Sequence, residues 1–111
     1  LSNADILVLG VAYKPDVSDT RESAAIDIID QLADWEATID YHDPHVPELD
    51  VVGTSYESVP LTTERLAAAD CVLLATDHSA FDIDEITEAA PFVFDTRNAT
   101  GECDADHVVR L

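Results

Sequence analysis

The sequence contains very few basic residues. Its 111 residues include 5 Lys+Arg against 24 Asp+Glu, which gives a formal net charge of -19. Proteins that bind nucleic acids or anionic membranes neutralise phosphates with lysine and arginine, so we expect neither partner. A large excess of like charge adds self-repulsion, which halophilic proteins tolerate and use. The composition therefore favours adaptation to high salt over an ordinary acidic domain.

Methionine is absent and cysteine is rare. Without a methionine, we expect this chain to be a piece of a longer protein, and its length suits one domain, residues 1–111. Cys71 and Cys103 are too few for a disulfide framework or a zinc site. Cys71 lies in an apolar run, and we expect it to be a buried small hydrophobic residue. The two cysteines, the lack of a signal-peptide pattern and the lack of an apolar run of ~20 residues predict a cytoplasmic protein.

Glycine is also scarce, with three residues in the chain. The glycine-rich fingerprint of dinucleotide-binding domains is missing, because Gly10 is followed by Val-Ala-Tyr instead of a second glycine. We therefore do not expect this domain to bind a dinucleotide by itself in the usual way.

Apolar segments alternate with helical patterns along the chain. Continuous apolar runs are typical of strands buried on both faces of a parallel sheet, and spacings of three and four residues indicate amphipathic helices. The alternation predicts an α/β fold, a small doubly wound, mainly parallel sheet with helices on both faces (Rossmann-like). We expect strands at 5–12, 37–42, 70–76, 92–95 and 108–109, helices at 22–35, 61–69 and 82–90, and a short strand near 51–52 in the weakly patterned stretch 48–58.

The five cations are unevenly placed. Lys14, the only lysine, and Arg21 follow the first expected strand, and Arg97 follows the strand at 92–95. The carboxyl ends of parallel strands meet at one edge, where ligands bind in open α/β sheets, so we expect these three residues at the same rim. We expect Arg65 and Arg110 elsewhere. Arginine and lysine suit phosphate oxygens, which predicts an anion pocket, with phosphate as the obvious ligand.

The same cations could instead form ion pairs within the domain, because acids such as Asp16, Asp19 and Asp95 are their neighbours in the sequence. In favour of an anion site, a helix N-terminus near Glu22 would add backbone donors. Ser23 and Ser79 have no visible base partner, so the pattern does not support nucleophilic catalysis.

Three histidines fall beyond strand ends. His42 and His45 flank an Asp-Pro pair, and His78 follows a later strand. The rigid proline separates the first two, and no tetrahedral ligand set is evident. We therefore expect loop histidines that face solvent, with no metal site.

Four segments resemble, in order, elements of one known family. Leu-Gly-Val-Ala-Tyr-Lys-Pro-Asp at 9–16 and Asp-Thr-Arg-Glu-Ser at 19–23 resemble the opening of the C-terminal domain of the UDP-glucose/GDP-mannose dehydrogenases. Tyr-His-Asp-Pro-His-Val at 41–46 resembles its Asp-Pro-x-Val element, and Asp-Thr-Arg-Asn at 95–98 its late Asp-x-Arg element. Thr-Asp-His-Ser-Ala-Phe at 76–81 is similar to the branch that oxidises UDP-N-acetylhexosamines such as UDP-N-acetyl-mannosamine.

The resemblance implies oxidation of a sugar C6 alcohol to a carboxylate with two NAD+. In the family the cofactor fold and the catalytic cysteine belong to the N-terminal domain, so no catalytic residue is expected in this piece. By analogy, Lys14 would contact the UDP-sugar, Arg97 would bind its UDP portion and Arg21 would reach the cofactor pyrophosphate. The implied partners are a UDP-sugar, the rest of the same chain and, in the full-length protein, a second copy in a homodimer.

Two alternatives lack catalysis. A signalling receiver is also a small parallel α/β domain, but it needs an acidic pair after the first strand and a late lysine. Here the first strand leads to Tyr13-Lys14, and no lysine follows. A stand-alone nucleotide-binding module is the other alternative, and the coding sequence upstream of this domain would distinguish it from a dehydrogenase.

Overall fold

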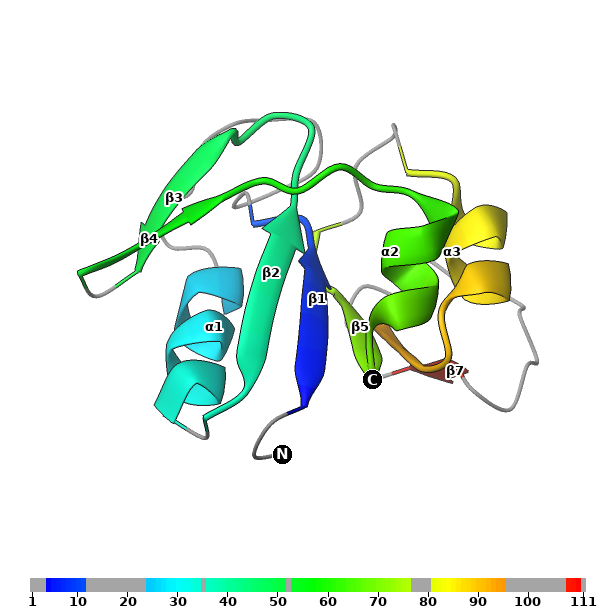
Figure 1. The fold of residues 1–111 in the computed structure, drawn as a ribbon, viewed down its shortest axis with the longest axis horizontal. Helices are drawn as coiled ribbons and strands as arrows, with labels where there is room; N and C mark the ends of the chain where they lie inside the picture. Colours follow the sequence, from blue (N-terminus) through cyan, green and yellow to red (C-terminus); the bar gives the residue numbers. More distant parts are fainter. Residues whose placement is uncertain are drawn as a thin grey trace.

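A five-stranded parallel sheet forms the centre of the molecule. The computed structural model describes residues 4–11, 24–34, 36–51, 53–76, 81–95 and 108–110. The sheet has the strand order β2-β1-β5-β6-β7, and a separate antiparallel hairpin pairs β3 with β4 (Figure 1). The predicted doubly wound α/β fold is confirmed. The elements are β1 (Asp5–Leu9), α1 (Ala24–Asp34), β2 (Thr38–His42), β3 (Glu48–Val51), β4 (Thr54–Glu57), α2 (Thr63–Ala68), β5 (Cys71–Leu74), α3 (Ile83–Ala89), β6 (Val93–Asp95) and β7 (Val108–Arg110).

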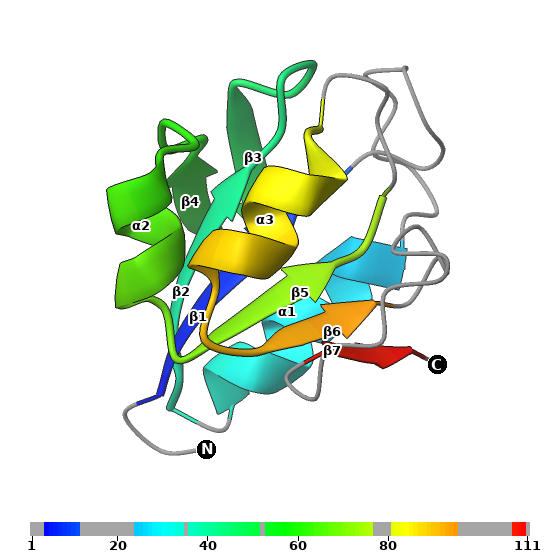
Figure 2. The same cartoon turned by 90° about the vertical axis from the view of Figure 1, so that its right-hand side faces the viewer.

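Helices cover both faces of the sheet. Helix α1 lies on one side, and α2 and α3 lie side by side on the other (Figures 1 and 2). Along β1, Ile6 and Val8 join the core on the α1 side, whereas Leu7 and Leu9 join the core on the α2 and α3 side. Both faces of this strand are buried, and for that reason its sequence is a continuous apolar run instead of an alternating one.

Helix α1 has the amphipathic character that its sequence predicts. Ala25, Ile29 and Leu32 are buried in the core, while Asp27 and Asp34 are exposed on the opposite side. The sequence predicts Asp19 or Thr20 as the N-cap of α1, and both lie outside the described residues.

Side-chain caps begin the two helices of the other face. The Thr62 side chain accepts a hydrogen bond from the backbone N–H of Arg65 at 3.0 Å, and the Asp82 side chain accepts one from Glu85 at 3.2 Å. Such caps satisfy backbone donors that have no partner within the helix. The sequence predicts either Thr62 or Thr63 as the cap of α2, and the structure shows that Thr62 is the cap.

The hairpin of β3 and β4 corrects the expectation of one short strand near 51–52. In β3, Leu49 and Val51 are buried in the core of the α1 side, while Glu48 and Asp50 are exposed. Gly53, with φ at 84°, precedes β4. The apolar alternation covers only four residues, and this short pattern was too weak to predict two strands.

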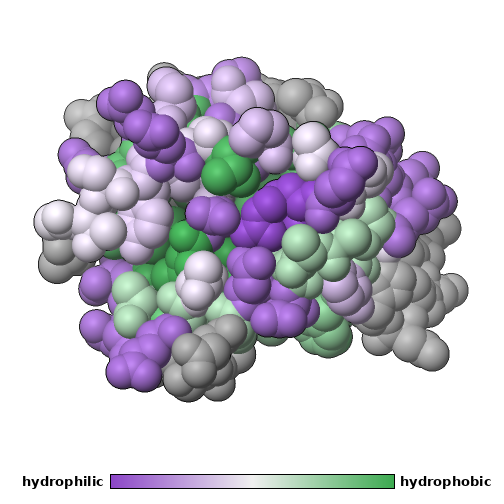
Figure 3. All heavy atoms as spheres, in the orientation of Figure 1, coloured by the Kyte–Doolittle hydropathy of each residue, from purple (hydrophilic) through white to green (hydrophobic). Residues whose placement is uncertain are grey.

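Acidic side chains lie mostly on the surface. Hydrophilic groups cover much of the face shown in Figure 3, with hydrophobic atoms visible between them. Exposure to water lets these charges coexist without desolvation. The exposed acids of the described segments are Asp27, Asp34, Glu36, Glu48, Asp50, Glu57, Glu64, Asp70, Asp82, Asp84, Glu85 and Glu88. Within the same segments, no helix is long and apolar enough to cross a membrane.

Candidate functional site

The strand order reverses direction between β1 and β5. From β1 the chain passes through α1 to β2 on one side, and it later returns to β5 on the other side of β1. In open α/β sheets the crevice beyond the carboxyl ends of such strands is the usual ligand site. In this molecule the residues that follow β1 and β5 at that edge are Gly10, Val11, Ala75 and Thr76.

Gly10 brings the ends of these two strands into close contact. Its φ is 84°, and a Cβ atom built there would lie 2.5 Å from the Cβ of Thr76 and 2.6 Å from its carbonyl oxygen. The N–H of Gly10 donates to the carbonyl of His42, and the N–H of Thr76 donates to that of Leu9. Only glycine fits both this backbone conformation and this packing. Gly10 therefore allows the ends of β1 and β5 to pack closely without belonging to a dinucleotide fingerprint.

Asp43 links three chain segments at the same edge. Its side chain is buried, and its Oδ2 accepts a hydrogen bond from the N–H of Val11 at 2.8 Å. Its Oδ1 accepts one from the N–H of His45 at 2.8 Å, and its own N–H donates to the Ser58 hydroxyl at 3.0 Å. The segments that leave β1, β2 and β4 thus meet at one residue, Asp43. Sequence reasoning identified the Asp-Pro element but missed this contact with Val11.

Buried polar residues concentrate at the carboxyl edge. Asp43, Thr76 and Asp95 are buried where β2, β5 and β6 end, and the fourth buried polar residue of the described chain, Thr87, lies on α3. Burying a polar group is unfavourable unless it is hydrogen-bonded. All four have polar or electrostatic contacts in the structure. A polar interior at this edge is the kind of environment that polar ligands require.

The three cations predicted to form the anion site, Lys14, Arg21 and Arg97, lie outside the described residues. Their segments begin where β1 and β6 end, and these strands run parallel in one sheet. The shared rim therefore stays a prediction. The expectation for Arg110 was wrong, because its backbone ends β7 in register with Asp95, at the carboxyl edge. The tail returns as a parallel edge strand, which places this residue there.

Arg65 lies away from the carboxyl edge, as predicted. Its guanidinium contacts Asp5 and Asp40 at 2.9 Å each, and Asp5 is the first residue of β1. Burial opposes the charge of Arg65, but the hydrogen bonds and charges of the two aspartates outweigh it and raise its pKa. Arg65 thus takes part in a structural ion-pair network with Asp5 and Asp40.

His42 and Tyr41 are held firmly at the end of β2. The Nδ1 atom of His42 lies 2.7 Å from the carbonyl oxygen of Val59, which can only accept, so Nδ1 carries the proton. This half-buried ring also packs against Phe81, so the expectation of a solvent-facing loop histidine was wrong for His42. The buried Tyr41 hydroxyl donates to the carbonyl of Val46, and burial together with nearby acids raises the pKa of Tyr41 to about 12.

The remaining candidates give no catalytic or metal site within the segments that the structure describes. His45 is exposed as expected, and His78 lies outside these segments. No three His, Cys, Asp or Glu side chains in them are placed to hold a metal ion. Cys71 is half-buried instead of buried, because it lines an apolar hollow of about 440 Å³ between α1 and the sheet, and burial raises the pKa of its thiol.

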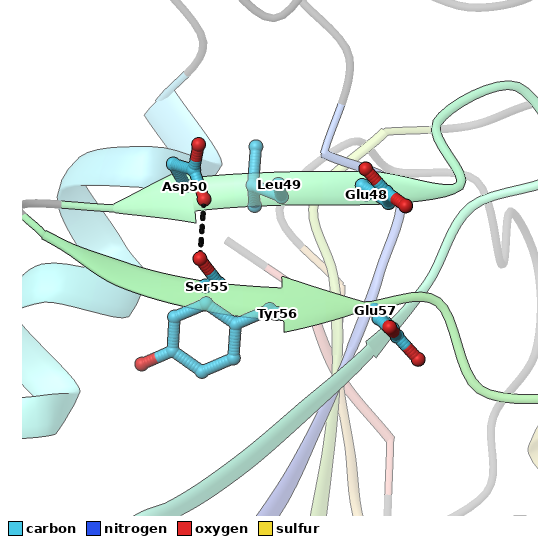
Figure 4. A pocket seen from close by; sticks show the side chains of 6 residues that line it. All are labelled: Glu48, Leu49, Asp50, Ser55, Tyr56 and Glu57. Atoms are coloured by element: carbon cyan, nitrogen blue, oxygen red, sulfur yellow. Dashed lines mark hydrogen bonds between the residues drawn. The ribbon is translucent and has the colours of Figure 1, made fainter.

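A second hollow, of about 360 Å³, lies on the hairpin (Figure 4). Glu48, Asp50 and Glu57 line it, and the Ser55 hydroxyl donates to Asp50 at 2.7 Å. Three carboxylates make this hollow unsuitable for the phosphates of a nucleotide. The carboxyl edge of the main sheet is therefore the better candidate for a phosphate ligand.

Comparison with known proteins agrees with this fold. The profile described as "UDP-glucose/GDP-mannose dehydrogenase family, UDP binding domain" matches residues 7–102. A UDP-N-acetyl-D-mannosamine dehydrogenase of Methanococcus maripaludis is 38% identical over 103 residues, which cover 84% of this chain and 22% of the relative. A UDP-N-acetyl-D-glucosamine 6-dehydrogenase of Pseudomonas aeruginosa is 31% identical over 81 residues, which cover 73% of this chain and 19% of the relative.

Solved structures share the fold. A structure of the UDP-N-acetyl-mannosamine dehydrogenase of Staphylococcus aureus superposes with a TM-score of 0.71 at 29% identity, covering 99% of this chain and 27% of the other. The chain thus spans about a fifth of the length of the curated relatives named above.

Proposed function

Because the chain belongs to the UDP-glucose/GDP-mannose dehydrogenase family, as its UDP binding domain, we propose that residues 1–111 are the C-terminal domain of an NAD-dependent UDP-sugar 6-dehydrogenase. The observation that carries the proposal is the family match over nearly the whole chain, residues 7–102. The reversal of strand order between β1 and β5 supports a ligand site at the carboxyl edge.

The proposed substrate is a UDP-N-acetylhexosamine, because the relatives named above act on the mannosamine and glucosamine forms. The sugar C6 alcohol, two NAD+ and one water give the carboxylate, two NADH and three protons. The N-terminal part of the enzyme supplies the catalytic cysteine and most of the NAD site, and this domain holds the nucleotide end of the substrate. No residue of this domain performs the chemistry.

Three cations carry the proposed binding. Lys14 contacts the UDP-sugar, Arg97 binds its UDP portion and Arg21 reaches the cofactor pyrophosphate. A domain with a net charge of -19 repels phosphates at long range, so local cations must overcome that field. Arginine provides a planar fork for phosphate oxygens and lysine a compact charge. The proposed protein is a cytoplasmic homodimer that tolerates high salt.

Activity of the full-length protein tests this proposal. Each of a panel of UDP-sugars is incubated with NAD+, and NADH is followed by absorbance. We expect two NADH per UDP-N-acetylhexosamine from the full-length protein and none from residues 1–111 alone. NADH production by this domain alone would contradict the assigned roles. Binding of UDP by a full-length protein that oxidises no UDP-sugar would favour the stand-alone nucleotide-binding module.

A further inference from the structure

We propose that Asp43 is a positioning residue that sets the path of the chain leaving β1 at the ligand edge. The inference rests on the proposed function, since the residue to be positioned is Lys14. It assigns Asp43 no contact with the ligand.

The carboxylate of Asp43 holds two backbone amides at once. Oδ2 accepts from Val11, which is 32 positions away in the sequence, and Oδ1 accepts from His45, each at 2.8 Å. Asp43 is 3% exposed; its contact with Val11 is buried, and its contact with His45 is partly buried. Hydrogen bonds from an amide to an ionised carboxylate are stronger than neutral ones. A neutral amide side chain has one carbonyl oxygen and could satisfy both amides only through that single atom.

Hydrogen bonds also restrain the backbone of Asp43. Its N–H donates to the Ser58 hydroxyl at 3.0 Å, and its carbonyl accepts from the N–H of Val46 at 3.3 Å. The carbonyl of Val46 in turn accepts from the buried Tyr41 hydroxyl at 2.8 Å. The position of the Asp43 side chain is therefore well defined, because β2, the turn that follows β2 and the segment after β4 all restrain the backbone of this residue.

The restraint acts on the two residues that follow β1 at the carboxyl edge. The N–H of Gly10 is held by the carbonyl of His42 and the N–H of Val11 by Asp43, so two successive amides are fixed by one neighbouring segment. Lys14 follows Val11 by three residues, which span at most about 11 Å. Lys14 is therefore close in sequence to a restrained amide, and we expect its placement to depend on Val11. Misplacing a binding group by about 1 Å can reduce a rate about a hundredfold.

The test compares Asp43→Asn with a control of similar stability in the full-length protein. Asn keeps the shape of the side chain but removes its charge and one of its two acceptor oxygens. Thr62→Ala is the control, because it removes the cap of α2 and lowers stability but leaves the contacts of Asp43 with Val11, His45 and Ser58 in place. The measurements are the Kd for UDP, kcat and KM for the UDP-sugar, and amide hydrogen exchange.

We expect Asp43→Asn to speed exchange at Val11 at least tenfold relative to amides of β5, and to raise the Kd for UDP or lower kcat/KM about tenfold. Thr62→Ala should change neither by more than about twofold. Unchanged binding and kcat/KM in Asp43→Asn, or equal losses in Thr62→Ala, would overturn the inference.

A second variant and a separate measurement allow the inference to be tested if the first experiment fails. If Asp43→Asn does not fold, Ser58→Ala loosens the same residue while keeping its carboxylate, and it should weaken UDP binding two- to threefold; no change there would contradict the inference. If the wild-type protein binds no UDP and oxidises no UDP-sugar, the proposed function fails. Exchange at Val11 in Asp43→Asn then still decides whether Asp43 fixes the path of the chain.

Discussion

The two edges of the sheet use charge in different ways. At the amino edge Arg65 contacts Asp5 and Asp40, and Asp5 and Asp70 exchange hydrogen bonds between the starts of β1 and β5. These contacts hold parts of the fold to one another. At the carboxyl edge the buried acids Asp43 and Asp95 lie where segments with three of the five cations begin. The comparison shows that Arg65 serves the fold, and we propose that Lys14, Arg21 and Arg97 serve a ligand.

The largest difference in the free energy of unfolding should appear between alanine substitutions at two glycines. Gly10→Ala combines an unfavourable φ of 84° with a contact of 2.5 Å to Thr76 at the carboxyl edge. Gly53→Ala has the same φ but nothing within 4 Å of the added Cβ. We expect losses in the free energy of unfolding of about 3 kcal/mol or more and about 1 kcal/mol, respectively. Urea unfolding measures both, and equal losses would show that the close packing of β1 on β5 contributes nothing.

The next largest effects should follow substitution of the three cations proposed to bind ligands, Lys14, Arg21 and Arg97. In the full-length enzyme each charge-assisted contact is worth about 1.5–3 kcal/mol, so each alanine variant should lose about one to two powers of ten in kcat/KM. Lys14→Ala should mainly impair turnover or sugar binding, Arg21→Ala should raise the requirement for NAD+, and Arg97→Ala that for the UDP-sugar. Steady-state kinetics with each substrate varied in turn separate these effects. Losses confined to stability would refute the roles.

Tyr41 should make stability depend on alkaline pH. Its pKa is about 12 in the folded protein, against about 10 in the unfolded chain, so the folded state keeps a proton that the unfolded state releases. The stabilisation is complete below pH 10 and is lost as pH rises toward 12, a change of about 2 kcal/mol. Unfolding of wild type and Tyr41→Phe at pH 9 and 12 measures it, and the variant should lose less between these values. The same loss in both proteins would assign the effect to other groups.

Arg65→Ala should have the smallest effect on function. The Arg65 side chain is 18% exposed, and its partners Asp5 and Asp40 are 34% and 44% exposed, so solvent screens the pairs. We expect a loss of about 1 kcal/mol in the free energy of unfolding. In the full-length enzyme kcat/KM should stay within about twofold at a temperature where the variant is folded. A loss as large as that of Arg97→Ala would remove the distinction between the two edges.

Local patterns in the sequence predicted much of the fold, because the sheet and helices obey them. The run before Gly10 is apolar throughout since both faces of β1 are buried, and the spacing of Ala25, Ile29 and Leu32 follows the helix period. The hairpin was missed because its alternating stretch is only four residues long. Periodicity indicates which face a side chain occupies but gives no partner for it.

The site contacts depend on partners that are distant in the sequence. Val11 meets Asp43 across 32 positions, and Arg65 meets Asp5 across 60. No local pattern specifies either pair. The backbone of Arg110 reached the carboxyl edge because the tail adds a parallel strand, which a count of charges after strands could not predict. Lys14, Arg21 and Arg97 remain predicted from strand order and family resemblance.

Amide hydrogen exchange of the full-length protein with and without UDP tests the central claim most directly. If the carboxyl edge holds the nucleotide, UDP should slow exchange at Val11, His45 and Thr76, while the amides of Asp5 and Asp70 at the amino edge should keep their rates. Protection at the amino edge alone, or at neither edge under conditions where UDP is bound, would contradict the account.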